Sequence, residues 1–276
     1  MHAKRLHGLQ LNAIDRRTVA ALLAELATNN GPNLANHVRA SLSSFFSWAM
    51  SQGLADANPI VGTSLAVTKG DRDRVLSDIE LRLIWNALGI DPYGDIVRLL
   101  ALTGQRRDEI GALRWSEVNF DKALISLPPE RTKNSRLHDI PLSPAALSIL
   151  KARPRVAGGE YVFTNGADGY RGWSNKKVAL DARIAGNGAI APWRLHDLRR
   201  TVSTRMHGDL QIAPHIVEAV LNHVSGHRAG VAGVYNRALY AKEKAVALTR
   251  WAEHLLAIVE GRQSKVIAIS KGKARR

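Results

Sequence analysis

Five side chains that could act together on a phosphodiester follow one another along this chain. Arg106 comes after a Thr-Gly pair, and His196 and Arg199 stand in the sequence His-Asp-Leu-Arg. His223 and Tyr235 come further along. A guanidinium binds two phosphate oxygens and keeps its charge, so two of them would stabilise the negative charge that develops during attack. With a tyrosine as nucleophile, the set indicates phosphodiester cleavage without a metal ion.

The spacing of these residues suggests individual tasks. His196 and Arg199 are three apart on a predicted helix, so both can reach one phosphate. Glu109 follows Arg106 by three residues and is interpreted as the group that orients its guanidinium. Lys133 is the best candidate for protonating the leaving 5′-oxygen, because a lysine on a mobile hairpin can be inserted beside the scissile bond. A tyrosine ester of the phosphate would conserve the energy of the broken bond for resealing.

Composition points to a polyanionic partner. The 276 residues carry 39 Lys and Arg against 24 Asp and Glu, a formal net charge of +15, which favours binding to nucleic acid. The absence of Cys excludes disulfides, thiolate zinc sites and a cysteine nucleophile. No apolar run reaches about 18 residues and no signal peptide is recognisable, so we expect a cytoplasmic protein without a membrane partner.

Four segments are expected along the chain. Residues 1–61 read as a helical unit, and residues 62–74 as an exposed linker whose last part is strongly charged. Residues 75–260 would form the larger unit. Residues 261–276 read as a basic tail with a short strand at 265–270, which we expect to add to a sheet edge of the same chain or a neighbour.

Hydrophobic periodicity predicts a mainly α fold with a small antiparallel sheet. Helices are expected after a cap at Asp15, after Ser143-Pro144, and near residues 33–52, 77–88, 95–102, 173–184, 196–207, 214–222 and 238–259. A short buried helix is expected around Ile110 and Leu113. In the helix at 33–52, the residues at helical spacing that we expect to face the core are Leu34, Val38, Leu42, Phe45 and Ala49. Residues 123–127 and 137–142 predict two strands joined by a polar hairpin at 131–136.

The motifs together resemble the phage-integrase family of tyrosine recombinases, with most similarity to integrases of prophages and genomic islands. The matching stretches are TGQRRDEI (103–110), TKNSR (132–136), RLHDLRRT (194–201), VLNHVSG (220–226) and GVYNR (233–237). The resemblance covers residues 33–260. The stretch Phe46-Ser47-Trp48-Ala49 and the closing Asn58-Pro59 are similar to the end of that family's core-binding domain, whose opening we expect to be clipped here.

The resemblance implies a helical core-binding domain followed by an α+β catalytic domain. Such a protein cleaves and rejoins DNA strands through a covalent 3′-phosphotyrosine intermediate, integrating or excising a mobile element. The implied partners are double-stranded attachment-site DNA, further copies of the chain in a synaptic tetramer, and accessory DNA-bending proteins. No cofactor and no metal are expected.

The resemblance also implies roles for named residues. The catalytic set would be Arg106, Lys133, His196, Arg199, His223 and Tyr235. The arginines would clamp the phosphate, the lysine would be the general acid and the tyrosine the nucleophile. His196 would be a general base or phosphate ligand, and His223 would donate a hydrogen bond to the phosphate. Further candidates for DNA contacts are Asn36, Arg39 and Ser43, on one polar flank of the helix at 33–52, and Arg131, Arg136 and Arg200.

Two departures from the family pattern leave alternatives open. Asn222 stands where the family usually has Gly before the histidine. The interval from His223 to Tyr235 is slightly long, so His227 is a rival for the histidine and Tyr240 a rival for the tyrosine.

Three other functions compete with the recombinase interpretation. A type IB topoisomerase uses a similar tyrosine and two arginines to relax DNA. A DNA-binding protein of the same fold could have lost catalysis, although every expected catalytic residue is present. A zinc site at His207, His215, His223 and His227 is not expected, because no Cys or nearby carboxylate would complete it.

Overall fold

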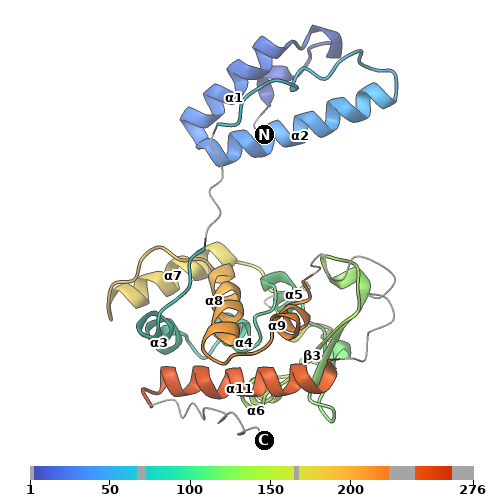
Figure 1. The fold of residues 1–276 in the computed structure, drawn as a ribbon. Helices are drawn as coiled ribbons and strands as arrows, with labels where there is room; N and C mark the ends of the chain where they lie inside the picture. Colours follow the sequence, from blue (N-terminus) through green and yellow to red (C-terminus); the bar gives the residue numbers. More distant parts are fainter. Residues whose placement is uncertain (1–2, 67–72, 165–167, 224–239, 263–276) are drawn as a thin grey trace, which may run out of the picture. The chain divides into compact units, whose positions relative to one another are not determined.

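The computed structural model describes residues 3–66, 73–164, 168–223 and 240–262. These residues belong to two compact units, Met1–Arg72 and Asp73–Arg276 (Figure 1). The predicted strand at 265–270, Tyr235 and His227 lie outside the described residues. Within the described residues, no helix combines the length and the apolarity that crossing a membrane would require.

The first unit is built on two packed helices, α1 (Arg16–Asn30) and α2 (Pro32–Ser51). As predicted, Asp15 caps α1, its carboxylate accepting the Thr18 amide at 2.8 Å. Gly31, with φ of +89°, separates the two helices. Two short 3₁₀ turns, η1 (Lys4–Leu6) and η2 (Leu11–Ala13), precede them.

The buried face of α2 differs by one residue from the predicted stripe. Phe45 was expected in the core, yet it is 40% exposed, while Phe46 is only 1% exposed. Phe46 follows Leu42 by four residues and precedes Ala49 by three, so it continues the helical stripe that faces α1. The prediction for Phe45 was therefore wrong in phase.

The polar flank of α2 holds the chain that follows it. The Arg39 guanidinium donates to the Thr63 carbonyl at 2.9 Å, and the Asn36 side-chain oxygen accepts the Ala66 amide at 2.8 Å. The Asn58 amide donates to the Ser43 carbonyl at 3.0 Å. Residues 62–66, expected in the linker, thus pack against α2.

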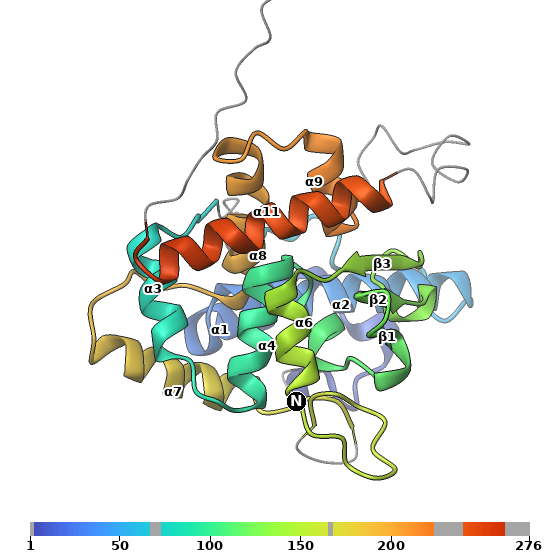
Figure 2. The same ribbon diagram turned by 90° about the horizontal axis from the view of Figure 1, so that it is seen from below.

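The second unit surrounds α4 (Pro92–Thr103), which is buried on nearly all sides. The other helices are α3 (Asp78–Ala87), α5 (Arg107–Gly111), α6 (Pro144–Lys151), α7 (Trp173–Ala185), α8 (Leu195–Gly208), α9 (Pro214–Leu221) and α11 (Ala241–Val259). α4 packs against α5, α6, α8 and α11. α11 crosses the unit, touching α3, α8, α9 and β3 as well (Figure 2).

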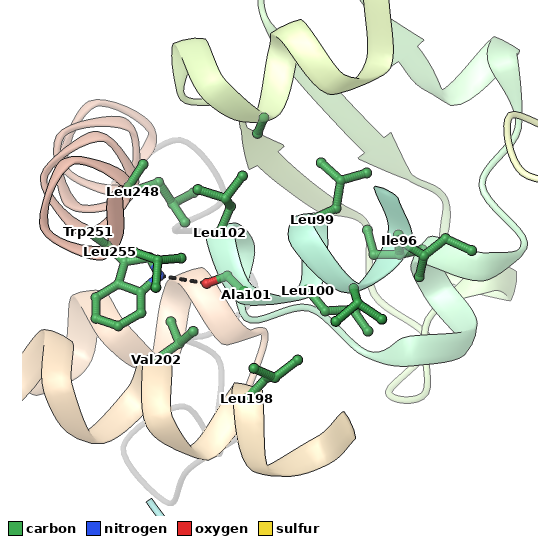
Figure 3. Packing of buried hydrophobic residues seen from close by; sticks show 14 of the residues in the cluster. Ile96, Leu99, Leu100, Ala101, Leu102, Leu198, Val202, Leu248, Trp251 and Leu255 are labelled. Atoms are coloured by element: carbon green, nitrogen blue, oxygen red, sulfur yellow. Dashed lines mark hydrogen bonds between the residues drawn. The ribbon is translucent and has the colours of Figure 1, made fainter. Parts of the chain in front are cut away.

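The core between α4, α8 and α11 is apolar with one directed contact. Leu102, Val202 and Leu248 are all buried there (Figure 3). The Trp251 indole donates to the Ala101 carbonyl at 2.8 Å. This bond satisfies a buried indole and anchors α11 on the central helix.

A three-stranded antiparallel sheet lies beside the helices, in the order β1 (Val118–Asn119), β2 (Leu124–Leu127), β3 (His138–Pro141). Ile125 opposes Ile140, and Leu127 opposes His138. The turns η3 (Trp115–Glu117) and η4 (Pro129–Arg131) flank β1 and β2. The predicted fold class, mainly α with a small antiparallel sheet, is confirmed; only the two-residue β1 was not predicted.

The predicted capping signals set the helix starts. Ser77 and Glu80 form the expected capping box of α3. α4 begins three residues earlier than expected, because the Asp91 carboxylate accepts the Gly94 amide at 2.7 Å and Pro92 suits the first turn.

Candidate active site

Arg199 joins two helix ends in the middle of the second unit. Its guanidinium, on α8, donates to the Gly104 carbonyl at 2.7 Å and also to the Leu221 carbonyl. The residue is 4% exposed. Gly104 ends α4 with φ of +67°, and a Cβ there would lie 2.8 Å from Leu221 Cδ2. The glycine therefore lets α4 and α9 approach closely enough to share one guanidinium.

Arg106 lies at the start of α5 and is held by the same region. Its Nη1 donates to Glu109 Oε1 at 2.9 Å, and its Nη2 reaches the Asn222 carbonyl at 3.5 Å. Glu109 is buried, and its other oxygen approaches the Arg106 amide. The contact agrees with the interpretation of Glu109 as the orienting group.

The two guanidiniums carry more positive charge than their surroundings offset. Burial, followed by the neighbouring charge of Arg106, lowers the pKa of Arg199 to about 10. Glu109 pairs with Arg106, whereas within the described residues no carboxylate comes within ion-pairing distance of Arg199. With a pKa of about 10, Arg199 stays protonated at neutral pH, so an anion would be favoured beside it.

Both histidines sit next to these charges. Desolvation, then Arg200 and Arg199, lowers the pKa of His196. Desolvation, then Arg199 and Arg106, lowers the pKa of His223 to about 4, and His196 contributes to that shift too. Both imidazoles are therefore neutral at physiological pH, and each can donate one hydrogen bond and accept another.

A second pair of buried polar residues supports the site and was missed by sequence reasoning. His138, on β3 and 3% exposed, has its Nε2 2.9 Å from Gln105 Oε1. The Gln105 amide nitrogen donates to the carbonyls of Thr103 and Val220. Because Gln105 Oε1 can only accept, the His138 Nε2 must carry the proton. The pair ties the sheet to the ends of α4 and α9.

Lys133 is exposed in the turn between η4 and β3. The neighbouring Asn134 donates to the Asn222 carbonyl at 2.9 Å, so the hairpin contacts the end of α9 beside His223. From the sequence alone, Asn222 was only a departure from a family pattern. Its contact with a residue 88 positions away has no local signal.

The arginines that are candidates for DNA contact differ in the contacts that they make within the protein. Arg131 is 17% exposed and donates to Glu117 at 2.8 Å and to the Ala112 carbonyl at 2.6 Å, so it braces the fold. Arg200 pairs with the fully buried Asp197 at 3.0 Å. The side chain of Arg136 is exposed.

Tyr240, the alternative nucleophile, and His223 lie at opposite ends of α9. Tyr240 is the N-cap residue of α11, and its ring centroid lies 5.3 Å from that of His215, at the start of α9. His223 follows the other end of that helix. No cluster of three or more His, Asp or Glu that could hold a metal occurs in the part of the chain the structure describes.

The phage integrase family matches residues 81–241, more than half of the chain. The chain belongs to the phage integrase family. Prophage integrase IntZ of Escherichia coli K12 is 28% identical over 253 residues, which cover 90% of this chain and 61% of IntZ. The chain thus spans about three fifths of that relative's length.

Solved integrase structures share the fold. A lambda integrase dimer bound to a core site matches with a TM-score of 0.61 and 22% identity, over 81% of this chain and 84% of that one. A lambda integrase tetramer bound to a Holliday junction matches with a TM-score of 0.59 and 22% identity, over 78% and 66%. At these identities the likeness concerns the fold. The family resemblance seen in the motifs is confirmed.

Proposed function

We propose that this phage integrase family member is a site-specific DNA recombinase. It cleaves and rejoins DNA strands through a covalent 3′-phosphotyrosine intermediate, and so integrates or excises a mobile element. The observation that carries the proposal is the meeting of Arg106 and Arg199 at the end of α9, with an uncompensated positive charge and two neutral histidines beside it.

The scissile phosphate binds between the two guanidiniums. Arg106 is aimed by Glu109, and Arg199 by two carbonyls that its Nη1 and Nη2 reach, so both are held before substrate arrives. Fixed donors stabilise charge that develops on the nonbridging oxygens without reorganising during the reaction. His223 donates a hydrogen bond to the same phosphate, and its low pKa keeps it neutral in this role.

Tyr235 is the nucleophile. Its oxygen attacks phosphorus and forms a P–O bond to the phenol, while the bond to the 5′-oxygen breaks. The phenol proton passes to His196, and Lys133 supplies a proton to the leaving oxygen. Attack by a 5′-hydroxyl on the phosphotyrosine reverses these transfers and reseals the strand without an external energy source.

Tyr240 is less suited to this role than Tyr235. Its ring packs on His215 in the first turn of α9, whereas His223 lies just past the last turn. Eight helical residues span about 12 Å, which separates Tyr240 from the arginines by the length of the helix.

The proposed partners rest on the net charge of the chain and on the fold that it shares with lambda integrase. A net charge of +15 favours a duplex, and lambda integrase, which shares the fold, is bound to DNA both as a dimer and as a tetramer. We assign residues 1–61 to DNA binding and residues 75–260 to catalysis. The whole protein would act in the cytoplasm as a tetramer on attachment-site DNA. Accessory DNA-bending proteins would assist it.

The test uses a nicked suicide duplex that carries the attachment site beside the coding gene. Loss of a short fragment after cleavage traps the covalent adduct, which should form equally in EDTA. Exchange of strands between two intact duplexes separates recombination from simple relaxation. A protein that binds this DNA but forms no adduct would be a non-catalytic binder, and the proposal would be wrong.

A further inference from the structure

We propose that Asn134 and Asn222 form a latch that positions Lys133 over the scissile phosphate. The inference rests on the proposed function, since it gives the general acid of that reaction its place. Both asparagines are positioning residues, acting through Lys133, and the pair is called the Asn134–Asn222 latch below.

The latch is a reciprocal set of hydrogen bonds between two distant parts of the chain. Asn134 Nδ2 donates to the Asn222 carbonyl at 2.9 Å and to Asn222 Oδ1 at 3.1 Å. Asn222 Nδ2 returns a bond to Asn134 Oδ1 at 3.1 Å. Asn222 is 7% exposed, so these bonds are partly shielded from water, which would otherwise compete with them.

The turn that holds Asn134 also holds Lys133. The Ser135 amide donates to the Thr132 carbonyl at 3.1 Å, so Lys133 and Asn134 are the two central residues of a β-turn. The Thr132 hydroxyl accepts the Arg136 amide at 3.0 Å and donates to the Arg136 carbonyl at 2.7 Å. A rigid turn with one central side chain anchored leaves its neighbour little freedom of backbone position.

The anchor on α9 is the same structure that aims the arginines. The Asn222 carbonyl accepts from Asn134 and, at 3.5 Å, from Arg106, while the preceding Leu221 carbonyl accepts from Arg199. His223 is the next residue. The latch therefore fixes the lysine hairpin to the same helix end as the phosphate clamp, which holds acid and phosphate in register.

Asparagine suits position 222 for two independent reasons. The residue caps α9 in the left-handed conformation, with φ of +51°, which Gly and Asn adopt more readily than other residues. Gly would satisfy the backbone but offer no amide to the hairpin. Asn222→Gly thus removes the two side-chain bonds of the latch, while the backbone carbonyl keeps its contacts with Asn134 and Arg106. Asn134→Ala removes all three latch bonds.

The test compares Asn222→Gly, Asn134→Ala and Lys133→Ala on two substrates. One is ordinary attachment-site DNA, and the other has a 5′-bridging phosphorothiolate, whose sulfur leaves without needing a proton. We expect Asn134→Ala, which loses all three latch bonds, to cleave ordinary DNA about tenfold or more slowly, a part of the rate that a general acid contributes. Asn222→Gly, which keeps one of the three bonds, should be slowed in the same direction but less. On the phosphorothiolate they should match the unmodified protein. Asn222→Gly should add no further defect to Lys133→Ala.

A control and an activity-free readout complete the test. Asn187→Ala removes an exposed side-chain amide that, among the residues the structure describes, bonds only to the Arg183 carbonyl in α7. It should leave both rates unchanged. Without DNA, Asn222→Gly should speed amide exchange in residues 132–136. Equal slowing on both substrates, or normal rates on both, would overturn the latch while recombination stands. An unmodified protein that forms no adduct would instead overturn the proposed function.

Discussion

At the residue scale, the surroundings of Arg199 favour the binding of an anion. The side chain is 4% exposed, and its bonds to Gly104 and Leu221 go to neutral carbonyls. A buried charge without an ionised partner costs stability, which is tolerated where an anion restores the balance. The planar fork explains why the position needs arginine, since each of its nitrogens can be aimed separately.

Arg199→Lys should therefore lower the cleavage rate by about a hundredfold, the loss typical when one transition-state donor is removed. DNA affinity should change little, because many other cations hold the duplex. Single-turnover cleavage and anisotropy binding measure the two effects. Arg107→Lys, in the exposed neighbour of Arg106, is the matched control and should be near normal. Near-normal cleavage by Arg199→Lys would show that Arg199 does not clamp the phosphate.

His138 makes stability depend on pH. Burial, then the charges of Lys244, Arg199 and Arg106, hold its pKa well below the ordinary 6.5. The unfolded chain takes up a proton near pH 6.5 that the folded site resists, so stability falls as pH drops below that value. His138→Gln should make this fall shallower by up to about 1.4 kcal/mol per pH unit.

Urea unfolding at pH 7.5, 6.5 and 5.5 measures that slope. The glutamine amide can still donate to Gln105, so the variant should fold. His196, His223 and His254 also have lowered pKa values. Their contribution to the pH dependence of the unfolding free energy is the same in the variant and in the unmodified protein. Identical pH dependence in the two proteins would mean that His138 is not the group responsible.

The arginines and histidines could be singled out as candidates from the sequence because their motifs are local. The Gln105–His138 pair and the Asn134–Asn222 latch were not predicted, since their members are 33 and 88 residues apart. Such pairs form only when the fold brings remote polar groups together. Phe45 was misplaced for another reason: adjacent aromatics on α2 both suit an apolar stripe, and only packing against α1 selects Phe46.

At the scale of elements, helix starts marked by a recognised capping residue were predictable, whereas the start of α4 and the contacts between helices were not. Side chains of Asp15, Ser77 and Ser143 cap the helices that follow, as their types indicated. β1 spans two residues, too few for alternation to reveal it. The close approach of α4, α8 and α9 at Gly104 depends on tertiary packing that periodicity does not encode.

Gly104→Ala should destabilise the second unit by about 2–4 kcal/mol. About 1–2 kcal/mol comes from the left-handed backbone, and the rest from crowding, because the new Cβ would meet Leu221 at 2.8 Å and Val202 at 3.0 Å. Gly158→Ala is the control: its φ of +73° gives similar strain, but nothing lies within 4 Å of its Cβ. Equal losses in urea unfolding would refute the close-packing argument.

At the scale of the whole molecule, two separate cores are present in the described residues. One cluster contains Val19, Phe46 and Ile60, and the other contains Leu99, Leu102 and Trp251. Residues 1–72 contain seven Lys and Arg and four Asp and Glu, so most of the +15 charge belongs to residues 73–276. Each unit thus has its own core, while the positive charge is concentrated in the larger one.

Residues 73–276 alone should unfold cooperatively, with a midpoint within about 3 °C of the corresponding transition in the full chain. The reason is that the larger core contains no residue of the first unit. Thermal unfolding followed by near-ultraviolet circular dichroism measures both proteins. A fragment without a cooperative transition would show that the second unit depends on the first.

In the proposed reaction, Arg106 and Arg199 hold a DNA phosphate for attack by Tyr235. The most direct measurement is covalent adduct formation on the suicide duplex by Tyr235→Phe and Tyr240→Phe, beside the unmodified chain. Loss of one phenol oxygen should abolish the adduct in Tyr235→Phe while binding stays intact, and Tyr240→Phe should still form it. An adduct formed by Tyr235→Phe, and lost in Tyr240→Phe, would show that Tyr240 and not Tyr235 is the nucleophile.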